Sequence, residues 1–138
     1  MGVFSVKAKL SHIQINVSDA AKSLPFYKDL LTYFGYTVMM EDPKFIGMDD
    51  GNGMTIWVND IEEKFKDNKF HRKSAGLNHL AFHVESKEDV DKFTKEFLQP
   101  RGLNILYESP KLFPEYTPDY YAVYFEDPDR IKLEVVSQ

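Results

Sequence analysis

Cysteine is absent from the 138-residue chain, which excludes disulfide bonds, a thiolate nucleophile and thiolate metal ligands. No apolar run approaches the roughly 20 residues of a membrane span, and the N-terminus lacks the apolar core of a secretory signal. The 17 basic residues are outnumbered by 22 acidic ones, and they form no dense run that could follow a phosphate backbone. We therefore expect a cytoplasmic protein with no membrane and no nucleic acid among its partners.

The composition is that of an ordinary globular protein, with 43% hydrophobic and 14% aromatic residues. A chain of 138 residues is long enough to bury a substantial core, and it is most naturally one domain, 1–138.

The chain contains one pattern twice. Residues 10–17 and 77–84 each place a histidine third and then alternate apolar with small or polar residues, which predicts a strand with two unlike faces. His12 and His79 lie 67 positions apart, and the same offset relates Phe26 to Phe93, Leu30 to Phe97, Leu31 to Leu98, Gly35 to Gly102 and Val38 to Ile105. We therefore predict two modules, about 4–59 and 77–137, joined by a charged linker, 60–76.

Each half reads as a strand, a helix and three further strands. The first half predicts strands at 4–17, 36–41, 45–48 and 54–59, with a helix that restarts near Ser23, holds Pro25 in its first turn and ends at Gly35. The second half predicts strands at 77–84, 103–108, 121–126 and 131–136, with a helix that follows Ser86 and stops at Pro100. The fold class is therefore α+β.

The second half is longer than the first. Matching the turn at 49–51 with the turn at 127–129 gives an offset of 78, so 11 additional residues fall around 109–119. This stretch is rich in proline and carries or adjoins Phe113, Tyr116 and Tyr120. It is either a flap over a pocket, with Tyr116 and Tyr120 binding substrate, or a surface excursion that only packs.

Three side chains are candidate metal ligands. His12 and His79 occupy matching positions of duplicated strands, and Glu134 points away from the core-facing side of the last strand. A buried carboxylate needs a partner, because burying an unpaired charge is costly. Two imidazoles and one carboxylate are the ligand set of the facial triad, which binds a divalent cation and leaves positions open. The alternative is that these three groups only hydrogen-bond to one another on a half-solvated sheet.

Several neighbours complete the expected site. Gln14 and Asn16 share a strand face with His12, and His83 shares one with His79, although about 13 Å of strand separates those two histidines. His83 is thus a weak candidate for catalysis, and His71 is given no role. At the offset of 78, Ile56 is the equivalent of Glu134 and would form an apolar wall of the pocket together with Met54 and Val58; Trp57 would then point into the core or an interface.

Four segments together resemble the vicinal oxygen chelate superfamily, which includes glyoxalase I, bleomycin-resistance proteins, fosfomycin-resistance proteins and extradiol dioxygenases. They are LSHI at 10–13, FYKDLL at 26–31, NHLAF at 78–82 and FEDPDRIKLE at 125–134. The resemblance implies two tandem βαβββ modules whose mixed sheets curl into an open barrel-like cleft, with helices on the outer faces. It also implies a divalent metal ion (Fe, Mn, Ni, Co or Zn) on His12, His79 and Glu134, and a homodimer.

The chain departs from the family pattern at informative positions. The fourth ligand of glyoxalase I-like members falls on Ile56, and Arg130 replaces the glycine usual in the Asp-Pro-Asp-Gly turn. No cluster of cations for a phosphonate can be identified in the sequence. The first hypothesis is a metal-dependent enzyme of lyase, isomerase or dioxygenase type that chelates a small oxygen-rich substrate, with Glu134 taking part in catalysis. The second is a metal-free binder that sequesters an antibiotic or metabolite, and the third is a partner-binding module.

Overall fold

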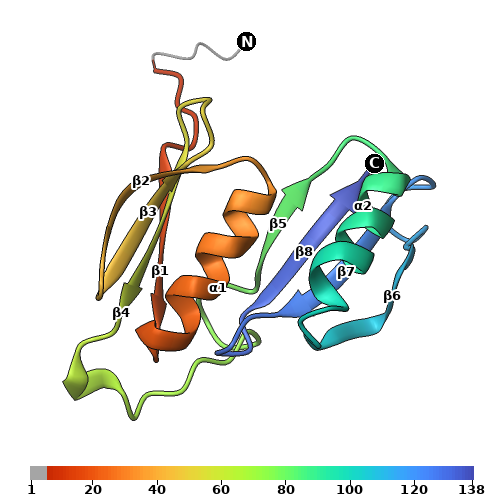
Figure 1. Cartoon of the computed structure of the whole chain (residues 1–138). Coiled ribbons are helices and arrows are strands. Elements are labelled where there is room, and N and C mark those ends of the chain that lie inside the picture. The colour runs from red at the N-terminus through yellow and green to blue at the C-terminus, as the bar shows by residue number, and fades with distance from the viewer. Residues whose placement is uncertain (1–5) are drawn as a thin grey trace. The chain divides into compact units, whose positions relative to one another are not determined.

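The structure, a computed structural model, describes residues 6–138 (Figure 1). Residues 4 and 5 of the predicted first strand lie outside the described residues. Two compact units divide the chain, one ending at Lys66 and the other beginning at Asp67. The elements of the first unit are β1 (His12–Val17), α1 (Ala20–Tyr33), β2 (Thr37–Asp42), β3 (Phe45–Asp49), β4 (Thr55–Asp60) and the short helical turn η1 (Glu63–Phe65).

The second unit repeats this order. Its elements are β5 (His79–His83), α2 (Lys87–Phe93), the π-helical continuation η2 (Thr94–Leu98), β6 (Ile105–Leu112), β7 (Tyr121–Glu126) and β8 (Lys132–Ser137). The two sheets have the strand orders β1-β4-β3-β2 and β5-β8-β7-β6, with a parallel outer pair and antiparallel neighbours in each. The α+β class and the two βαβββ modules are confirmed. A cleft shared by the two sheets stays a prediction.

Strand register defines how the two halves correspond. His12 pairs with Thr55 in the first unit, and His79 pairs with Lys132 in the second. The first strands are therefore 67 positions apart and the last strands 77, so the second half carries ten additional residues rather than 11. All ten fall within the hairpin of β6 and β7, because Val38 with Met48 and Ile105 with Phe125 are still equivalent pairs.

The additional residues are not one loop. β6 extends to Leu112, and Lys111 and Leu112 pair with β7 after an irregularity that begins beyond Leu106. Within that irregularity Tyr107 and Glu108 both adopt left-handed backbone conformations, with φ of 60° and 56°. The predicted excursion at 109–119 is thus part strand and part loop.

Helix α1 runs unbroken from Ala20, with no restart near Ser23. Asp19 caps it by accepting a hydrogen bond from the Ala21 N–H (3.1 Å), and the helix begins at Ala20 rather than near Ser23. Pro25 therefore lies in the second turn, where its missing N–H leaves the Ala21 carbonyl without its helical partner. Ala21 is exposed, so water can satisfy that carbonyl.

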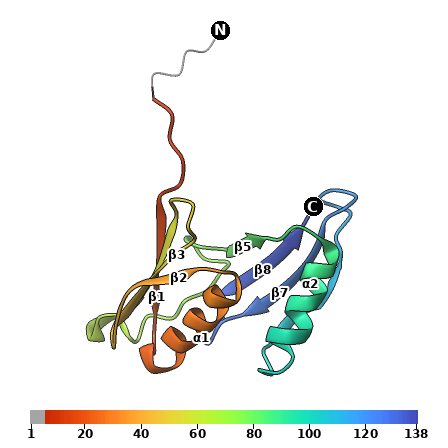
Figure 2. The same ribbon diagram turned by 45° about the horizontal axis from the view of Figure 1, so that its top comes forward.

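Each helix covers one face of its own sheet. α1 packs on β3 and β4, while α2 packs on β7 and β8, as Figure 2 shows for the second unit. The buried side chains of the first unit include Ile15, Val17, Leu24, Tyr27, Leu30, Leu31, Ile46, Met48, Ile56 and Val58. The helix-covered core leaves the opposite face of each sheet to carry polar groups. No helix among residues 6–138 is long and apolar enough to cross a membrane.

Candidate metal centre

His79 and Glu134 form the centre of the candidate site in the second unit. His79 begins β5, and Glu134 lies in the middle of the adjacent strand β8 with no exposed side-chain surface. The His79 Nε2 and Glu134 Oε1 atoms are 3.1 Å apart. This distance suits an ion pair, but Oε1 accepts no hydrogen bond from any described residue, so the imidazole is not directed as a donor to it.

Asn78 determines which nitrogen of His79 is available. The Asn78 Oδ1 lies 2.7 Å from the His79 Nδ1. Because an amide oxygen can only accept, the proton of the neutral ring is on Nδ1 and the lone pair is on Nε2. A nitrogen lone pair of the partly exposed His79 and an oxygen of the buried Glu134 carboxylate therefore face each other at 3.1 Å. Two such electron-rich atoms repel each other, and a cation between or beside them would relieve that repulsion.

The other oxygen of Glu134 is held by Tyr120. The Tyr120 hydroxyl donates to Oε2 at 2.5 Å. Burial and this hydrogen bond raise the pKa of Tyr120 to about 12, so its hydroxyl is a donor at neutral pH. Tyr120 thus engages one carboxylate oxygen and leaves Oε1 as the free one. The sequence placed Tyr120 near the substrate; the structure places it on Glu134.

Tyr124 was missed by the sequence analysis. It lies directly opposite Glu134 in the β7–β8 pairing, and its ring is 6.0 Å from the His79 ring. Burial, together with the charge of Glu134, raises the pKa of Tyr124. The sequence could have indicated this pairing, because a hairpin whose turn is centred on Asp129 places positions 124 and 134 opposite each other.

The residues of the extended hairpin cover this sheet face. Phe113 is buried and packs with Ala122, Tyr124 and Val136 in a small second core, and Leu106 and Tyr120 lie against it. Tyr116, by contrast, is 61% exposed, although its ring contacts that of Tyr120 with centroids 5.0 Å apart. The hairpin is therefore packed onto the face that carries Glu134 rather than projecting away from it.

His12 has a similar local environment in the first unit. It begins β1 and is exposed, and the Ser11 Oγ lies 3.0 Å from its Nδ1. The residue before each repeated histidine thus engages Nδ1, which leaves Nε2 as the available ligand atom in both halves. Gln14 and Asn16 lie on the same exposed face of β1, as predicted from the alternation.

The predicted role of Ile56 is wrong. The last strands are related by 77 positions, not 78, so Trp57 and not Ile56 is the equivalent of Glu134. A shift of one residue reverses every side chain of a strand. Ile56 is 1% exposed and, like Val58, belongs to the core beneath α1, so neither lines an apolar pocket wall.

Trp57 lies on the open face of the first sheet. Its ring packs against Gly47 of β3, and its Nε1–H donates to the Thr55 Oγ1 (3.0 Å). Trp57 is half-buried, and Gln14 pairs with it across the parallel strands. Where the second half has a carboxylate, the first half has an indole.

The remaining candidate, His83, is exposed at the end of β5 and pairs with Val136. No group of three or more His, Asp or Glu side chains that could hold a metal ion is found among residues 6–138. His79 and Glu134 alone fit a divalent cation well, since one neutral nitrogen and one carboxylate oxygen are free and adjacent.

A family model described as the glyoxalase/bleomycin resistance protein/dioxygenase superfamily matches residues 9–135. The chain belongs to this superfamily. The crystal structure of a glyoxalase-like protein from Bacillus halodurans is similar at 40% identity, with a TM-score of 0.85, covering 94% of this chain and 95% of that one.

Two further proteins are similar to the chain over most of its length. The protein YqjT of Bacillus subtilis strain 168 is 37% identical over 128 residues, which are 93% of this chain and 98% of YqjT. The metallothiol transferase FosB of Staphylococcus saprophyticus is 29% identical over 126 residues, which are 91% of this chain and 74% of FosB.

Proposed function

We propose that the chain is a metal-dependent enzyme of the glyoxalase superfamily, with a divalent cation held by His79 and Glu134 and by His12 of the other half. The observation that supports it is the free His79 Nε2 facing the free Glu134 Oε1 at 3.1 Å. Asn78 contacts the other ring nitrogen of His79, and Tyr120 donates to the other carboxylate oxygen of Glu134. Such outer partners orient metal ligands in proteins.

A bound divalent metal supplies Lewis acidity, which stabilises negative charge that develops on substrate oxygens. Tyr120 holds one oxygen of Glu134 and would leave the other to the metal, and the Tyr124 ring lies beside the His79 ring, with centroids 6.0 Å apart. Both hydroxyls stay protonated at neutral pH because their pKa values are raised by burial and by Glu134. They therefore serve as donors and not as bases.

The position of Trp57 bears on the reaction type. An indole cannot transfer a proton as a second carboxylate would, so isomerisation of the glyoxalase I type is disfavoured. The similarity to FosB favours a lyase or a group-transfer reaction on a small oxygen-rich substrate, with a thiol as one candidate second substrate. Cleavage by dioxygen remains the third class to test. We expect the enzyme to act as a homodimer.

Metal content tests the proposal. Protein purified without chelator is analysed for Fe, Mn, Ni, Co and Zn, and each metal is then titrated into the metal-free chain. His79→Ala and Glu134→Gln are expected to lose the site, His12→Ala to weaken it, and His83→Ala, on the same strand as His79, to retain it. Circular dichroism confirms that each variant is folded. Wild-type affinity in the Glu134→Gln variant would overturn the assignment.

Activity separates the reaction classes once the metal is known. Thiol addition to an epoxide, oxygen uptake with a catechol, and isomerisation of a hemithioacetal are compared in the wild type and in His79→Ala. Activity that survives His79→Ala does not come from this centre.

A metal-free binding function is the second candidate, and Trp57 favours it. A half-buried indole held flat by Gly47 and Thr55 is suited to stack on a planar ligand. Quenching of its fluorescence by a ligand in the absence of metal, with no metal bound at micromolar concentration, would favour this function over the enzyme.

A further inference from the structure

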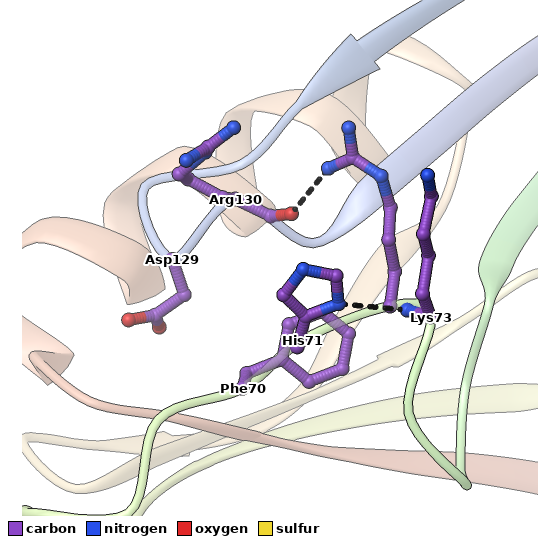
Figure 3. A pocket seen from close by; sticks show the side chains of 6 residues that line it. Phe70, His71, Lys73, Asp129 and Arg130 are labelled. Atoms are coloured by element: carbon purple, nitrogen blue, oxygen red, sulfur yellow. Dashed lines mark hydrogen bonds between the residues drawn. The ribbon is translucent and has the colours of Figure 1, made fainter.

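A pocket in the second unit has no part in the proposed centre. It has a volume of about 270 Å³ and is lined by Phe70, His71, Arg72, Lys73, Asp129 and Arg130. Two segments form it, the part of the predicted linker at 70–73 and the turn between β7 and β8. Figure 3 shows the His71 ring in the middle of the pocket, between Lys73 on one side and Asp129 and Arg130 on the other.

The pocket is positively charged, although the chain as a whole has a formal charge of −5. Its lining has three permanent cations, Arg72, Lys73 and Arg130, against the single carboxylate of Asp129. Glu126 forms ion pairs with Arg72 and Arg130, and its negative charge offsets one of their two positive charges. Acidic residues are interleaved with the basic ones along the linker, and folding brings Arg72 and Lys73 together with Arg130.

Arg72 is fixed in the pocket wall. Its Nη1 donates to the Glu126 Oε2 (2.6 Å) and to the Arg130 carbonyl oxygen (3.1 Å). Glu126 is only 5% exposed and also accepts from the Asn104 Nδ2 (2.7 Å). The Arg72 side chain, which is 19% exposed, is thus packed against the rest of the second unit.

His71 presents a donor. Its Nδ1 accepts the backbone N–H of Lys73 at 3.1 Å, so the proton of the neutral ring is on Nε2. The ammonium group of Lys73, the guanidinium group of Arg130 and this N–H are therefore three kinds of donor around one space. All three prefer an acceptor that carries negative charge.

We propose that this pocket binds a small tetrahedral oxyanion, either free phosphate or the phosphate or phosphonate group of a larger molecule. Lys73 and Arg130 supply charge, His71 supplies a neutral donor, and Arg72 holds the wall in place. The pocket needs no metal, so the proposal is independent of the proposed enzymatic function.

The pocket is also connected to His79. The Asn78 Nδ2 donates to the Arg72 carbonyl oxygen at 3.4 Å, while its Oδ1 engages His79. The segment 70–73, which forms the pocket wall, therefore also holds Asn78, and Asn78 orients the His79 ring. An oxyanion bound in this pocket would therefore lie near Asn78, which contacts His79 and is not itself a metal ligand.

Phosphate titration of the metal-free full-length protein tests the inference. The imidazole C–H resonances of His71 are followed by NMR, with sodium chloride added to keep the ionic strength constant. We expect a saturable shift at His71 with phosphate and none with chloride. Methylphosphonate and methyl phosphate are titrated in parallel: tighter binding of these than of phosphate assigns the group to a larger molecule, and equal or weaker binding assigns the free anion.

The variants Lys73→Gln and Arg130→Gly identify the ligands. Arg130 has φ of 66°, a conformation that glycine adopts without strain, and the substitution keeps the carbonyl that anchors Arg72. Each variant is expected to weaken phosphate binding about tenfold, since each removes a charge-assisted contact. Lys69→Gln, in the same segment but outside the pocket, is expected to change nothing. No saturable shift, or equal affinity in the Lys73→Gln/Arg130→Gly double variant, would overturn the proposal.

Discussion

The indole ring of Trp57 lies flat against Gly47 on the neighbouring strand β3. A Cβ added at Gly47 would come within 2.5 Å of the ring carbon atoms, closer than packed atoms approach. Glycine at this position is therefore required by the ring and not by backbone conformation. The ring in turn occupies the strand position that Glu134 has in the second half.

Gly47→Ala is expected to displace the indole and to destabilise the protein by about 1–3 kcal/mol, as overpacking does. Trp57 is the single tryptophan of the chain, so its fluorescence maximum reports the displacement directly. Urea unfolding measures the cost. In a Trp57→Ala background the same substitution should cost much less, and a double-mutant cycle without coupling would show that the contact has no energetic effect.

Asn78→Ala is expected to lower metal affinity roughly 10- to 100-fold while leaving both ligands in place, because His79 loses the acceptor that fixes its tautomer. Asn78→Asp keeps an oxygen at that position and should retain most of the affinity. Competition with a chromophoric chelator measures both. If Asn78→Ala and wild type bind metal equally, the orientation of His79 comes from elsewhere.

Tyr120→Phe should destabilise the metal-free protein by about 1.5–3 kcal/mol, because it leaves a buried carboxylate oxygen without its donor. Tyr116→Phe is the matched control. It changes an exposed ring in the same hairpin, and a change within about 0.5 kcal/mol is expected. Equal effects of the two substitutions in urea unfolding would contradict the assignment of Tyr120 to Glu134.

The pair of Glu126 and Arg72 predicts acid sensitivity. Burial alone would raise the pKa of Glu126, but hydrogen bonds from Arg72 and Asn104 and the charges of both arginines lower it below the ordinary 4.5. A lowered folded-state pKa contributes stability that is present above pH 4.5 and is lost as the pH falls through the folded-state value.

Glu126→Gln should therefore be less stable than wild type at neutral pH, with a smaller loss of stability between pH 5 and pH 3. Glu115→Gln, an exposed substitution in the same unit, is the control and should follow the wild-type profile. Parallel acid profiles for Glu126→Gln and wild type would exclude the ion pair as the cause.

Sequence periodicity predicted the faces of strands well. The alternation of His12, Gln14 and Asn16 with the apolar residues of β1 holds, and the strand predicted at 121–126 has those bounds in the structure. These features depend on the local chain, so they can be read from neighbouring residues.

The error at Ile56 has a different origin. The two halves were aligned on their turns, and a turn can gain or lose a residue without changing the fold. A strand cannot, because each shift exchanges its two faces. Anchoring the alignment on the paired strands gives Trp57.

The docking of Arg72 could not be predicted from the sequence. Arg72 and Glu126 are separated by 54 positions, and the segment around Arg72 has no periodicity that assigns it to a surface. Only the folded chain shows that the linker supplies a wall to the second unit. The position of Tyr124 was predictable in part, since hairpin symmetry alone would have placed it opposite Glu134.

The confinement of all ten additional residues to the hairpin of β6 and β7 has an evolutionary consequence. The carboxylate is positioned by β8, whose pairing with β5 and with the neighbouring part of β7 is retained in the shorter half. What covers the carboxylate is a hairpin extension that the shorter half does without. Selection can therefore remodel access to Glu134 by changing the length and aromatic content of one hairpin, without altering the strands that hold the chemistry.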